Sequence, residues 1–232
     1  MTANPLNTAL LCLLCEDFQG ILPESRTQLY VEVVQCVLIR YRKKKDETAV
    51  AVLAAVLEAN TTLTNLDLQG NNIGPAGAES LATALKTNTA LTNLDLQGNN
   101  IGPAGAESLA TALKTNTTLT NLDLSYSNNI GPAGAESLAT ALKTNTTLTN
   151  LALSSNNIDP AGAESLATAF KTNTALTNLD LSYGNNIGPA GAESLATALK
   201  TNTTLTNLDL SYGNNIGPAG AESLATALKT NT

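Results

Sequence analysis

Hydrophobic and polar positions follow one pattern that recurs six times after residue 62. In its first part Leu66 and Leu68 flank Asp67, and this period of two is typical of a β-strand whose alternate side chains face a core. The spacing then changes to the helical i, i+3, i+4 and i+7, as at Ala78, Leu81, Ala82 and Leu85. The pattern therefore predicts a short strand and one helix in every copy.

The residues between these segments predict how each helix begins and ends. Gly74-Pro75 supplies a helix start, since proline at the first helical position gives up no intrahelical hydrogen bond. Asn88 is placed to end the helix in a left-handed conformation. Because alanine fills half of the apolar stripe, each copy has a thin core, and we expect stability to come from the stacking of copies.

The copies also define the organisation of the chain. Residues 1–45 are predicted to form a helical amino-terminal cap, and residues 46–62 a half repeat whose Leu53 and Leu57 align with Leu81 and Leu85. Six repeats follow over residues 63–232, with a period of 28 residues, or 29 where an insertion containing tyrosine widens a loop. Their ranges are 63–90, 91–118, 119–147, 148–175, 176–204 and 205–232. A fixed period of this length is typical of a solenoid.

The register within a repeat is more specific than its length. Leucine, asparagine and isoleucine spell L-x-x-L-x-L-x-x-N-x-I, with Leu63, Leu66, Leu68, Asn71 and Ile73 in the first repeat. This motif resembles leucine-rich repeats of the ribonuclease-inhibitor type. The resemblance implies an α/β fold, a right-handed horseshoe with a parallel sheet on its concave face and helices on its convex face. It also implies a protein-interaction module that catalyses no reaction.

One asparagine recurs at the same place in every repeat and is expected to be structural. An inward asparagine in this turn can satisfy backbone groups of adjacent loops, and each such bond contributes about 1 kcal/mol. The column consists of Asn71, Asn99, Asn128, Asn156, Asn185 and Asn214.

The outward side chains of the predicted sheet and its rim are the candidate partner-binding residues: Asp67, Asp95, Asp123, Ala152, Asp180, Asp209, Asn150, Asn178, Tyr126, Tyr183 and Tyr212. A further outward column is expected at Gln69, Gln97, Ser125, Ser154, Ser182 and Ser211. Aspartates on strands ~4.8 Å apart repel by about 0.9 kcal/mol even at the dielectric constant of water. Two interpretations stay open: a cationic partner crosses several strands, or aspartate is a soluble residue multiplied by duplication and screened by water.

The fourth repeat departs most from the others and is the best candidate for selective contact. It has Ala152 in place of aspartate, Ser155 in place of the glycine or the tyrosine-containing loop, Asp159 in place of glycine and Phe170 in place of leucine. Ala152 is a neutral step between two acidic blocks, whereas Asp159 favours a helix cap and Phe170 is expected to fill core space. We expect Ala152 and the rim tyrosines to act together.

Composition argues against catalysis and against nucleic acid. The chain has no His, and its three cysteines, Cys12, Cys15 and Cys36, lie before the repeats, so the repeats provide no nucleophile, base or metal cage. We expect no cofactor, no metal and buried structural thiols. Residues 46–232 hold six Lys or Arg against fifteen Asp or Glu, a net charge of -9, which repels phosphate backbones and anionic membranes.

The amino-terminal segment carries a second resemblance. Asn4-Pro5-Leu6, Leu11-Cys12, Leu22-Pro23 and Arg26-Thr27-x-Leu29-Tyr30 are similar to the small helical subdomain after the nucleotide-binding core of NACHT-type, NOD-like receptors. The resemblance implies a ligand-sensing part of an innate immune receptor, with Pro5 matching the proline beside the adenine. No G-x-x-x-x-G-K-[ST] occurs in these 232 residues, so we expect no ATP switch within them.

Location and partners follow from the remaining features. The apolar run near Cys12 has no basic segment before it and is too short to cross a membrane, so the protein is expected to be cytoplasmic. The expected partner is a protein, with a basic surface in the cationic interpretation. Two alternatives are a regulator or inhibitor of a GTPase or nuclease, and a truncated gene product without selected function. The second predicts self-association through exposed Leu224 and Leu228.

Overall fold

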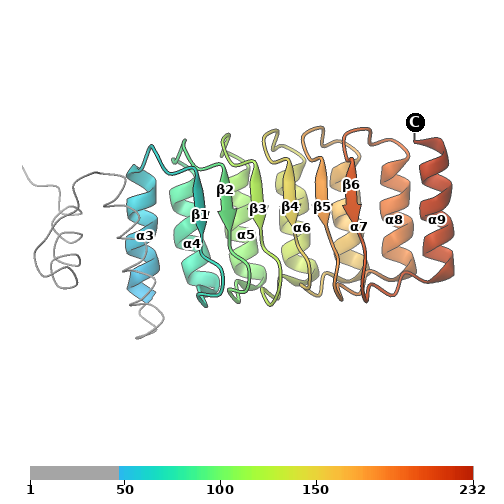
Figure 1. Ribbon diagram of the computed structural model, residues 1–232, viewed down its shortest axis with the longest axis horizontal. Coiled ribbons are helices and arrows are strands. Elements are labelled where there is room, and N and C mark those ends of the chain that lie inside the picture. Colours follow the sequence, from blue (N-terminus) through green and yellow to red (C-terminus); the bar gives the residue numbers. More distant parts are fainter. Residues whose placement is uncertain (1–46, 232) are drawn as a thin grey trace, which may run out of the picture.

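A computed structural model describes residues 47–231 of the 232-residue chain. Helices and strands alternate along these residues (Figure 1). The helices are α3 (Glu47–Ala59), α4 (Gly74–Leu85), α5 (Gly102–Leu113), α6 (Gly131–Leu142), α7 (Asp159–Phe170), α8 (Gly188–Leu199) and α9 (Gly217–Thr230). The strands are β1 (Asn65–Asp67), β2 (Asn93–Asp95), β3 (Asn121–Asp123), β4 (Asn150–Ala152), β5 (Asn178–Asp180) and β6 (Asn207–Asp209). The cap and the cysteines predicted before residue 46 lie outside the described residues.

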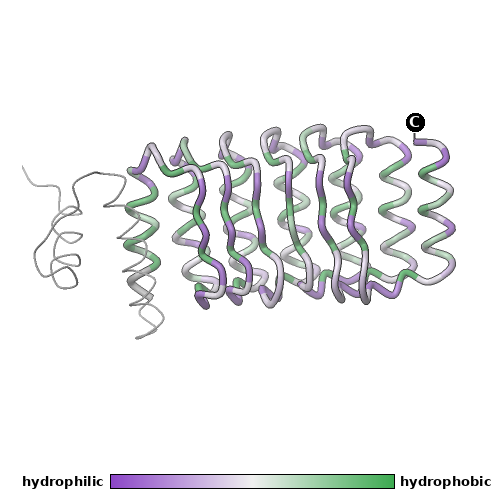
Figure 2. Tube along the Cα trace, viewed as in Figure 1, coloured by the Kyte–Doolittle hydropathy of each residue, from purple (hydrophilic) through white to green (hydrophobic). Residues whose placement is uncertain are grey.

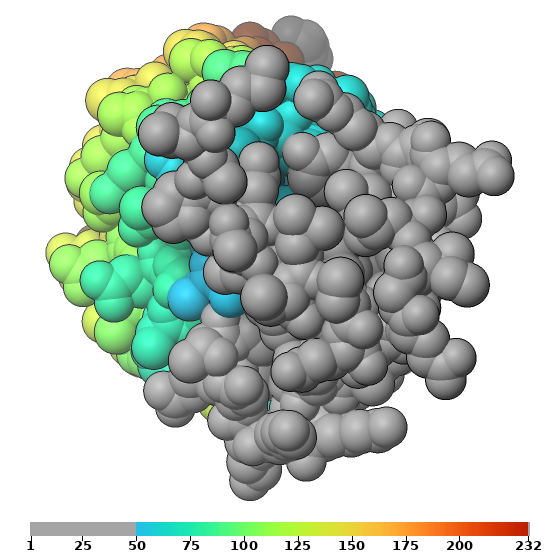
Figure 3. Space-filling model, turned by 90° about the vertical axis from the view of Figure 1, so that its left-hand side faces the viewer, coloured from blue at the N-terminus to red at the C-terminus, as the bar shows by residue number. Residues whose placement is uncertain are grey.

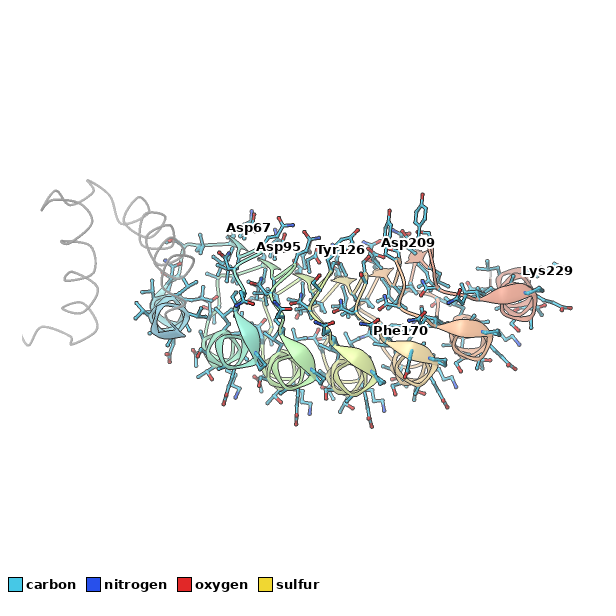
Figure 4. The ribbon with its side chains drawn as sticks, turned by 90° about the horizontal axis from the view of Figure 1, so that it is seen from below. Asp67, Asp95, Tyr126, Phe170, Asp209 and Lys229 are labelled. Carbon is cyan, nitrogen blue, oxygen red and sulfur yellow. The ribbon has the colours of Figure 1, made fainter. Side chains whose placement is uncertain are left out.

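The six strands form one parallel sheet in chain order, from β1 to β6. Equivalent residues of neighbouring repeats face each other, so that Leu66 pairs with Leu94 and Asp67 with Asp95. The helices cover one face of this sheet and follow an outer arc, while the strands line the inner side (Figure 4). Seen from the amino-terminal side, the repeats lie one behind another, from blue through green to yellow (Figure 3). The predicted α/β solenoid with its parallel sheet is confirmed.

The core fills the space between the sheet and the helices. Hydrophobic residues recur along each helix and strand (Figure 2). In the second repeat, Leu94 and Leu96 of the strand region and Leu109 and Leu113 of α5 are all at most 2 % exposed. The hydrophobic period of two in the strands and the helical period after them therefore predict correctly which residues face the core. Both segments turn their apolar residues to one shared layer.

Small residues set the distance between neighbouring helices. A Cβ atom on Gly105 of α5 would lie 2.9 Å from the Ala78 Cβ of α4 and 2.5 Å from Cγ2 of Ile101. The same glycine recurs in the helices of the other repeats, in equivalent surroundings. Glycine and alanine at these positions thus allow the helices to stack at the spacing that the sheet requires.

The end of each helix differs from the sequence-based prediction. Asn88 is not among the described residues with positive φ, and Lys86, the C-cap of α4, has a right-handed helical conformation. Instead, the Asn88 Nδ2 donates to the Leu57 and Asn60 carbonyl oxygens at 2.7 and 2.9 Å. Its Oδ1 accepts from the Ala90 and Leu91 amides. The prediction was wrong because the asparagine side chain forms the hydrogen bonds to backbone groups at the helix ends, and the asparagine backbone does not become left-handed.

Candidate binding surface

A groove of about 340 Å³ runs over the face of the sheet that points away from the helices. Residues from all six strands line it, and the outward positions carry asparagine and aspartate in rows. Asp67, Asp95 and Asp209 lie on this side in Figure 4, opposite the helices. Because the register repeats without slippage, each residue type forms a straight column across the strands.

The aspartate column brings like charges together. Asp95 pairs in register with Asp67 on one side and with Asp123 on the other. Burial raises the pKa of the Asp95 carboxyl, the hydrogen bond from the Gln97 N–H lowers it, and the charges of Asp123 and Asp67 raise it again. The resulting pKa lies above its usual value, so the ionised form of Asp95 is disfavoured at this site.

Each aspartate also has a local role that the sequence pattern did not reveal. The Asp67 Oδ1 accepts the Gln69 N–H at 3.0 Å, and the Asp209 Oδ1 accepts the Ser211 N–H at 2.8 Å. Asp95, Asp123 and Asp180 accept from the residue two positions later in the same way. These bonds turn the chain at the end of every strand except β4, and they use only one oxygen of each carboxylate.

The fourth repeat interrupts this column. Ala152 stands in register between Asp123 and Asp180, so those two aspartates have only one acidic neighbour each. Beside it, the Asn178 Nδ2 donates to the Asn150 Oδ1 across the β4–β5 pair. Of the four unusual residues in this repeat, Ala152 faces the groove, whereas Phe170 is only 3 % exposed and packs in the core.

Asp159 caps helix α7 from a left-handed backbone position. Its φ is +62°, and its Oδ1 accepts the Ala161 and Gly162 amides at 2.7 and 3.1 Å. Glycine occupies the equivalent place in the other repeats, for example Gly74 with φ +67°. The substitution thus adds a capping side chain at a position where an L-residue is otherwise disfavoured.

Three of the four serines expected to point outward are buried, whereas Ser211 is exposed as expected. Ser125, Ser154 and Ser182 are at most 2 % exposed, and the Ser154 and Ser182 hydroxyl oxygens lie 3.1 Å apart. Gln69 is exposed and Gln97 is half-buried at the corresponding places. The outward expectation was wrong for these three serines, because the strands end two residues earlier, at Asp123, Ala152 and Asp180, and strict alternation does not extend to the serine.

Three tyrosines come together at the loops that follow β3, β5 and β6. The ring centroids of Tyr126 and Tyr183 are 5.9 Å apart with a tilt of 46°, and those of Tyr183 and Tyr212 are 4.7 Å apart and stacked. Their exposed fractions are 40 %, 44 % and 68 % in that order. Desolvation raises the pKa of Tyr183, and Tyr212, Tyr126, Asp209 and Asp180 raise it further.

The contact between Tyr126 and Tyr183 crosses a whole repeat. Tyr126 belongs to the third repeat and Tyr183 to the fifth, while the fourth has the smaller Ser155 in its shorter loop. Sequence reasoning named each tyrosine but missed that they touch. The one feature of the sequence that could have indicated this contact is that a 28-residue repeat with a shorter loop lies between two 29-residue repeats.

The asparagine column is buried between the turns of neighbouring repeats. The Asn99 Oδ1 accepts the Asn71 N–H at 2.9 Å, and its Nδ2 donates to the Leu68 carbonyl oxygen at 2.9 Å. The same type of bond joins the Asn156 N–H to the Asn185 Oδ1. The six members, Asn71, Asn99, Asn128, Asn156, Asn185 and Asn214, are at most 3 % exposed.

A second asparagine column was not predicted, although the sequence analysis placed one of its members, Asn88, at a helix end. It contains Asn60, Asn88, Asn116, Asn145, Asn173, Asn202 and Asn231, at the ends of the helices. Asn60, Asn116, Asn145 and Asn202 begin Asn-x-Thr triplets, but their side chains are at most 5 % exposed. A folded chain therefore does not present these amides to a glycosylating enzyme.

Residues 47–231 were also searched for groups that could bind a metal ion and for helices that could span a membrane. No group of three or more His, Cys, Asp or Glu in this range could hold a metal ion. Nor does any helix in this range have both the length and the apolar character of a membrane span.

Comparison with protein families identifies the repeats. Six segments match the family described as Leucine Rich repeat: residues 59–82, 87–110, 115–139, 144–167, 172–196 and 201–225. The chain belongs to the leucine-rich repeat family. A leucine-rich repeat array of this kind is a protein-binding module, and the fold is typical of binding domains that are not enzymes.

Solved structures with the same fold include a leiomodin domain and a tropomodulin domain. The structure titled "Leiomodin-1 Actin-Binding Site 2 (ABS2)" has a TM-score of 0.51 and 21% sequence identity, and the match covers 77% of this chain and 86% of that one. The tropomodulin C-terminal domain of Caenorhabditis elegans has a TM-score of 0.50 and 14% identity, with 85% and 92% covered. At these identities the likeness establishes the fold. A comparison with curated proteins gives no match.

Proposed function

We propose that the leucine-rich repeats bind a basic segment of a protein partner along the groove of the sheet. The observation that carries this proposal is the charge of the groove, which is lined by four aspartates, with Asp95 between two others. The lysines of the described residues, by contrast, follow the helices or end them: Lys86, Lys114, Lys143, Lys171, Lys200 and Lys229. A cationic partner would meet only negative charge in the groove.

Binding of a cation would relieve a repulsion that already exists in the unbound fold. The hydrogen bonds to the backbone occupy one oxygen of each carboxylate, so the second oxygen can accept from a Lys or Arg side chain. Contacts of this kind weaken as salt screens them, and they increase the rate of association more than they slow dissociation.

A fluorescent peptide rich in Lys and Arg tests the proposal. We expect Asp95→Asn to weaken its binding about threefold, because the variant removes one charge while its Oδ1 still accepts the Gln97 N–H. The matched control is Glu107→Gln, which removes an exposed charge from helix α5 and should leave affinity unchanged. An affinity that neither salt nor Asp95→Asn changes would contradict the proposal.

A narrower proposal concerns the biological setting. The resemblance of residues 1–45 to the helical subdomain of NACHT-type receptors supports a role as the ligand-sensing part of a cytoplasmic NOD-like receptor in innate immunity. Sequencing the full transcript tests it, since an upstream, in-frame G-x-x-x-x-G-K-[ST] is required. If the bound partner is a GTPase or nuclease whose rate changes on binding, the chain is a regulator instead.

We also propose that the carboxyl-terminal face of the solenoid supports self-association. Leu228 is 62% exposed, whereas its equivalent one repeat earlier, Leu199, is 8% exposed. Leu205, Leu208 and Leu210 are only partly buried, and β6 has one strand neighbour. Apolar side chains beside an open strand edge favour contact with a second copy.

A further inference from the structure

The three tyrosines form a continuous exposed strip, which we call the tyrosine strip: Tyr126, Tyr183 and Tyr212. The stacked pair Tyr183 and Tyr212 cover each other's inner faces at a centroid distance of 4.7 Å. The outer face of Tyr212 remains open, in agreement with its 68% exposure. The rings of Tyr126 and Tyr183 are tilted by 46° and are not stacked, so they leave a second aromatic surface between them.

Carboxylates accompany the strip. Asp209 lies three residues before Tyr212, and Asp180 lies three residues before Tyr183. One oxygen of each accepts a backbone amide, from Ser211 and Ser182 respectively, both at 2.8 Å. These bonds fix the carboxylates at the end of the strand from which the tyrosine loop departs. An open aromatic face and a fixed carboxylate thus occur together at the last two strands.

We infer that the tyrosine strip makes this binding module select arginine over lysine in its basic partner. The inference rests on the proposed function, because it names the chemistry of a segment already held in the groove. A guanidinium is planar, stacks on aromatic rings and can donate two parallel hydrogen bonds to a carboxylate at the same time. A lysine ammonium is a compact, strongly hydrated charge and gains less from the ring face.

The other end of the groove offers a comparison within the same molecule. At β1 and β2 the outward aspartates, Asp67 and Asp95, are followed by Gln69-Gly70 and Gln97-Gly98 instead of tyrosine loops. Charge is present there without an aromatic face, so the first two repeats should attract both cations alike. Selectivity is therefore expected to reside in the later repeats, while general attraction extends over the whole sheet.

Two matched peptides test the inference with the full chain. One carries three arginines separated by glycine and serine, and the other carries lysine at the same places. Fluorescence anisotropy at low salt should give about threefold tighter binding of the arginine peptide to the unmodified protein. In the triple variant Tyr126→Asn, Tyr183→Asn and Tyr212→Asn this ratio should fall to about one, since asparagine tolerates the φ of +49° to +54° at these positions but has no ring. Tyr212→Phe keeps the ring and should keep the ratio.

Asp67→Asn separates the inference from the proposed function. This variant lies at the end without tyrosine and should weaken both peptides by the same factor. Equal affinities for the two peptides, or an arginine preference that survives the triple asparagine variant, would overturn the inference while the charge-based function stands. If neither peptide binds even at low salt, the proposed function fails, and arginine selection fails with it.

Discussion

At the scale of single residues, asparagine amides join each repeat to the next at two levels. One column lies in the turn after the strand, where the Asn156 Nδ2 donates to the Leu124 carbonyl oxygen at 2.7 Å. The other lies after the helix, where the Asn173 Nδ2 donates to the Leu142 carbonyl oxygen at 2.7 Å. Both bonds run from one repeat to the preceding one. An amide is suited to this task because it donates and accepts at once.

Asn156→Ala should therefore destabilise the fold by about 2–3 kcal/mol. The change removes the donors to the Leu124 and Leu153 carbonyl oxygens and the acceptor of the Ile130 N–H, and these groups would remain buried. The shift is measured as the change in free energy of unfolding in urea. Asn157→Gly is the matched control, because Asn157 is exposed with φ +56°, which glycine adopts freely. Equal losses in both variants would contradict the role of the buried amide.

The two columns differ in how far they could be predicted. The position of Asn71 in the leucine motif indicated an inward amide with backbone partners, and its burial agrees with that expectation. Asn88 looked like a left-handed helix end, since asparagine is common there. The partners of its Nδ2, the Leu57 and Asn60 carbonyl oxygens, belong to the preceding half repeat. A local pattern carries no information about carbonyl groups that only stacking brings near.

At the scale of elements, the distance between helices depends on one closely packed glycine in each of α4 to α9. Gly105 lies in the first half of α5, and the nearest atoms to a Cβ placed there come from Ile101, Ala78 and Pro75, the last two on α4. Helix propensity alone would favour alanine by about 1 kcal/mol at this position. Close approach of α4 opposes that preference.

Gly105→Ala should destabilise the protein by about 2 kcal/mol despite the better helix propensity of alanine. A Cβ at 2.5 Å from Ile101 Cγ2 and 2.9 Å from Ala78 Cβ forces the helices apart, which also strains the strand pairing. Thermal unfolding followed by circular dichroism measures the loss. The control is Ser108→Ala in the same helix, which should change stability by less than about 0.5 kcal/mol. Stabilisation by Gly105→Ala would show that the helices can adjust freely.

Strands and helices were predictable, whereas the loops between them were not. Each repeat changes its hydrophobic period once, and the strand and helix follow that change in every copy. The pattern gave no such guide at Ser125, which is buried although it continues the alternation. It also gave no guide to the contact of Tyr126 with Tyr183, because that contact depends on the short loop at Ser155. The sequence thus predicted the columns along the strands and named the rim tyrosines, but it did not predict the contacts between their rings.

At the scale of the whole molecule, each repeat relies on a neighbour for burial. Leu195 of the fifth repeat is 1% exposed because α9 lies beyond it, whereas its equivalent Leu224 in α9 is only partly buried. Stacking therefore stabilises inner repeats on two sides and the last described repeat on one. The result is a solenoid whose carboxyl-terminal face has the same apolar character as the contacts that hold its interior together.

Leu228→Glu should weaken self-association of the 232-residue chain by about tenfold or more. A leucine side chain that becomes buried contributes about 1.5–3 kcal/mol, and Leu228 is the most exposed leucine of this face. Sedimentation velocity over a range of protein concentrations measures the dissociation constant. Thr226→Glu adds the same charge to an exposed position of α9 without removing apolar area, so it should leave association unchanged. If both variants dissociate alike, added charge and not the loss of leucine is the cause. A wild-type chain that stays monomeric at every concentration would exclude the contact, and the apolar face would then have no role in joining two copies.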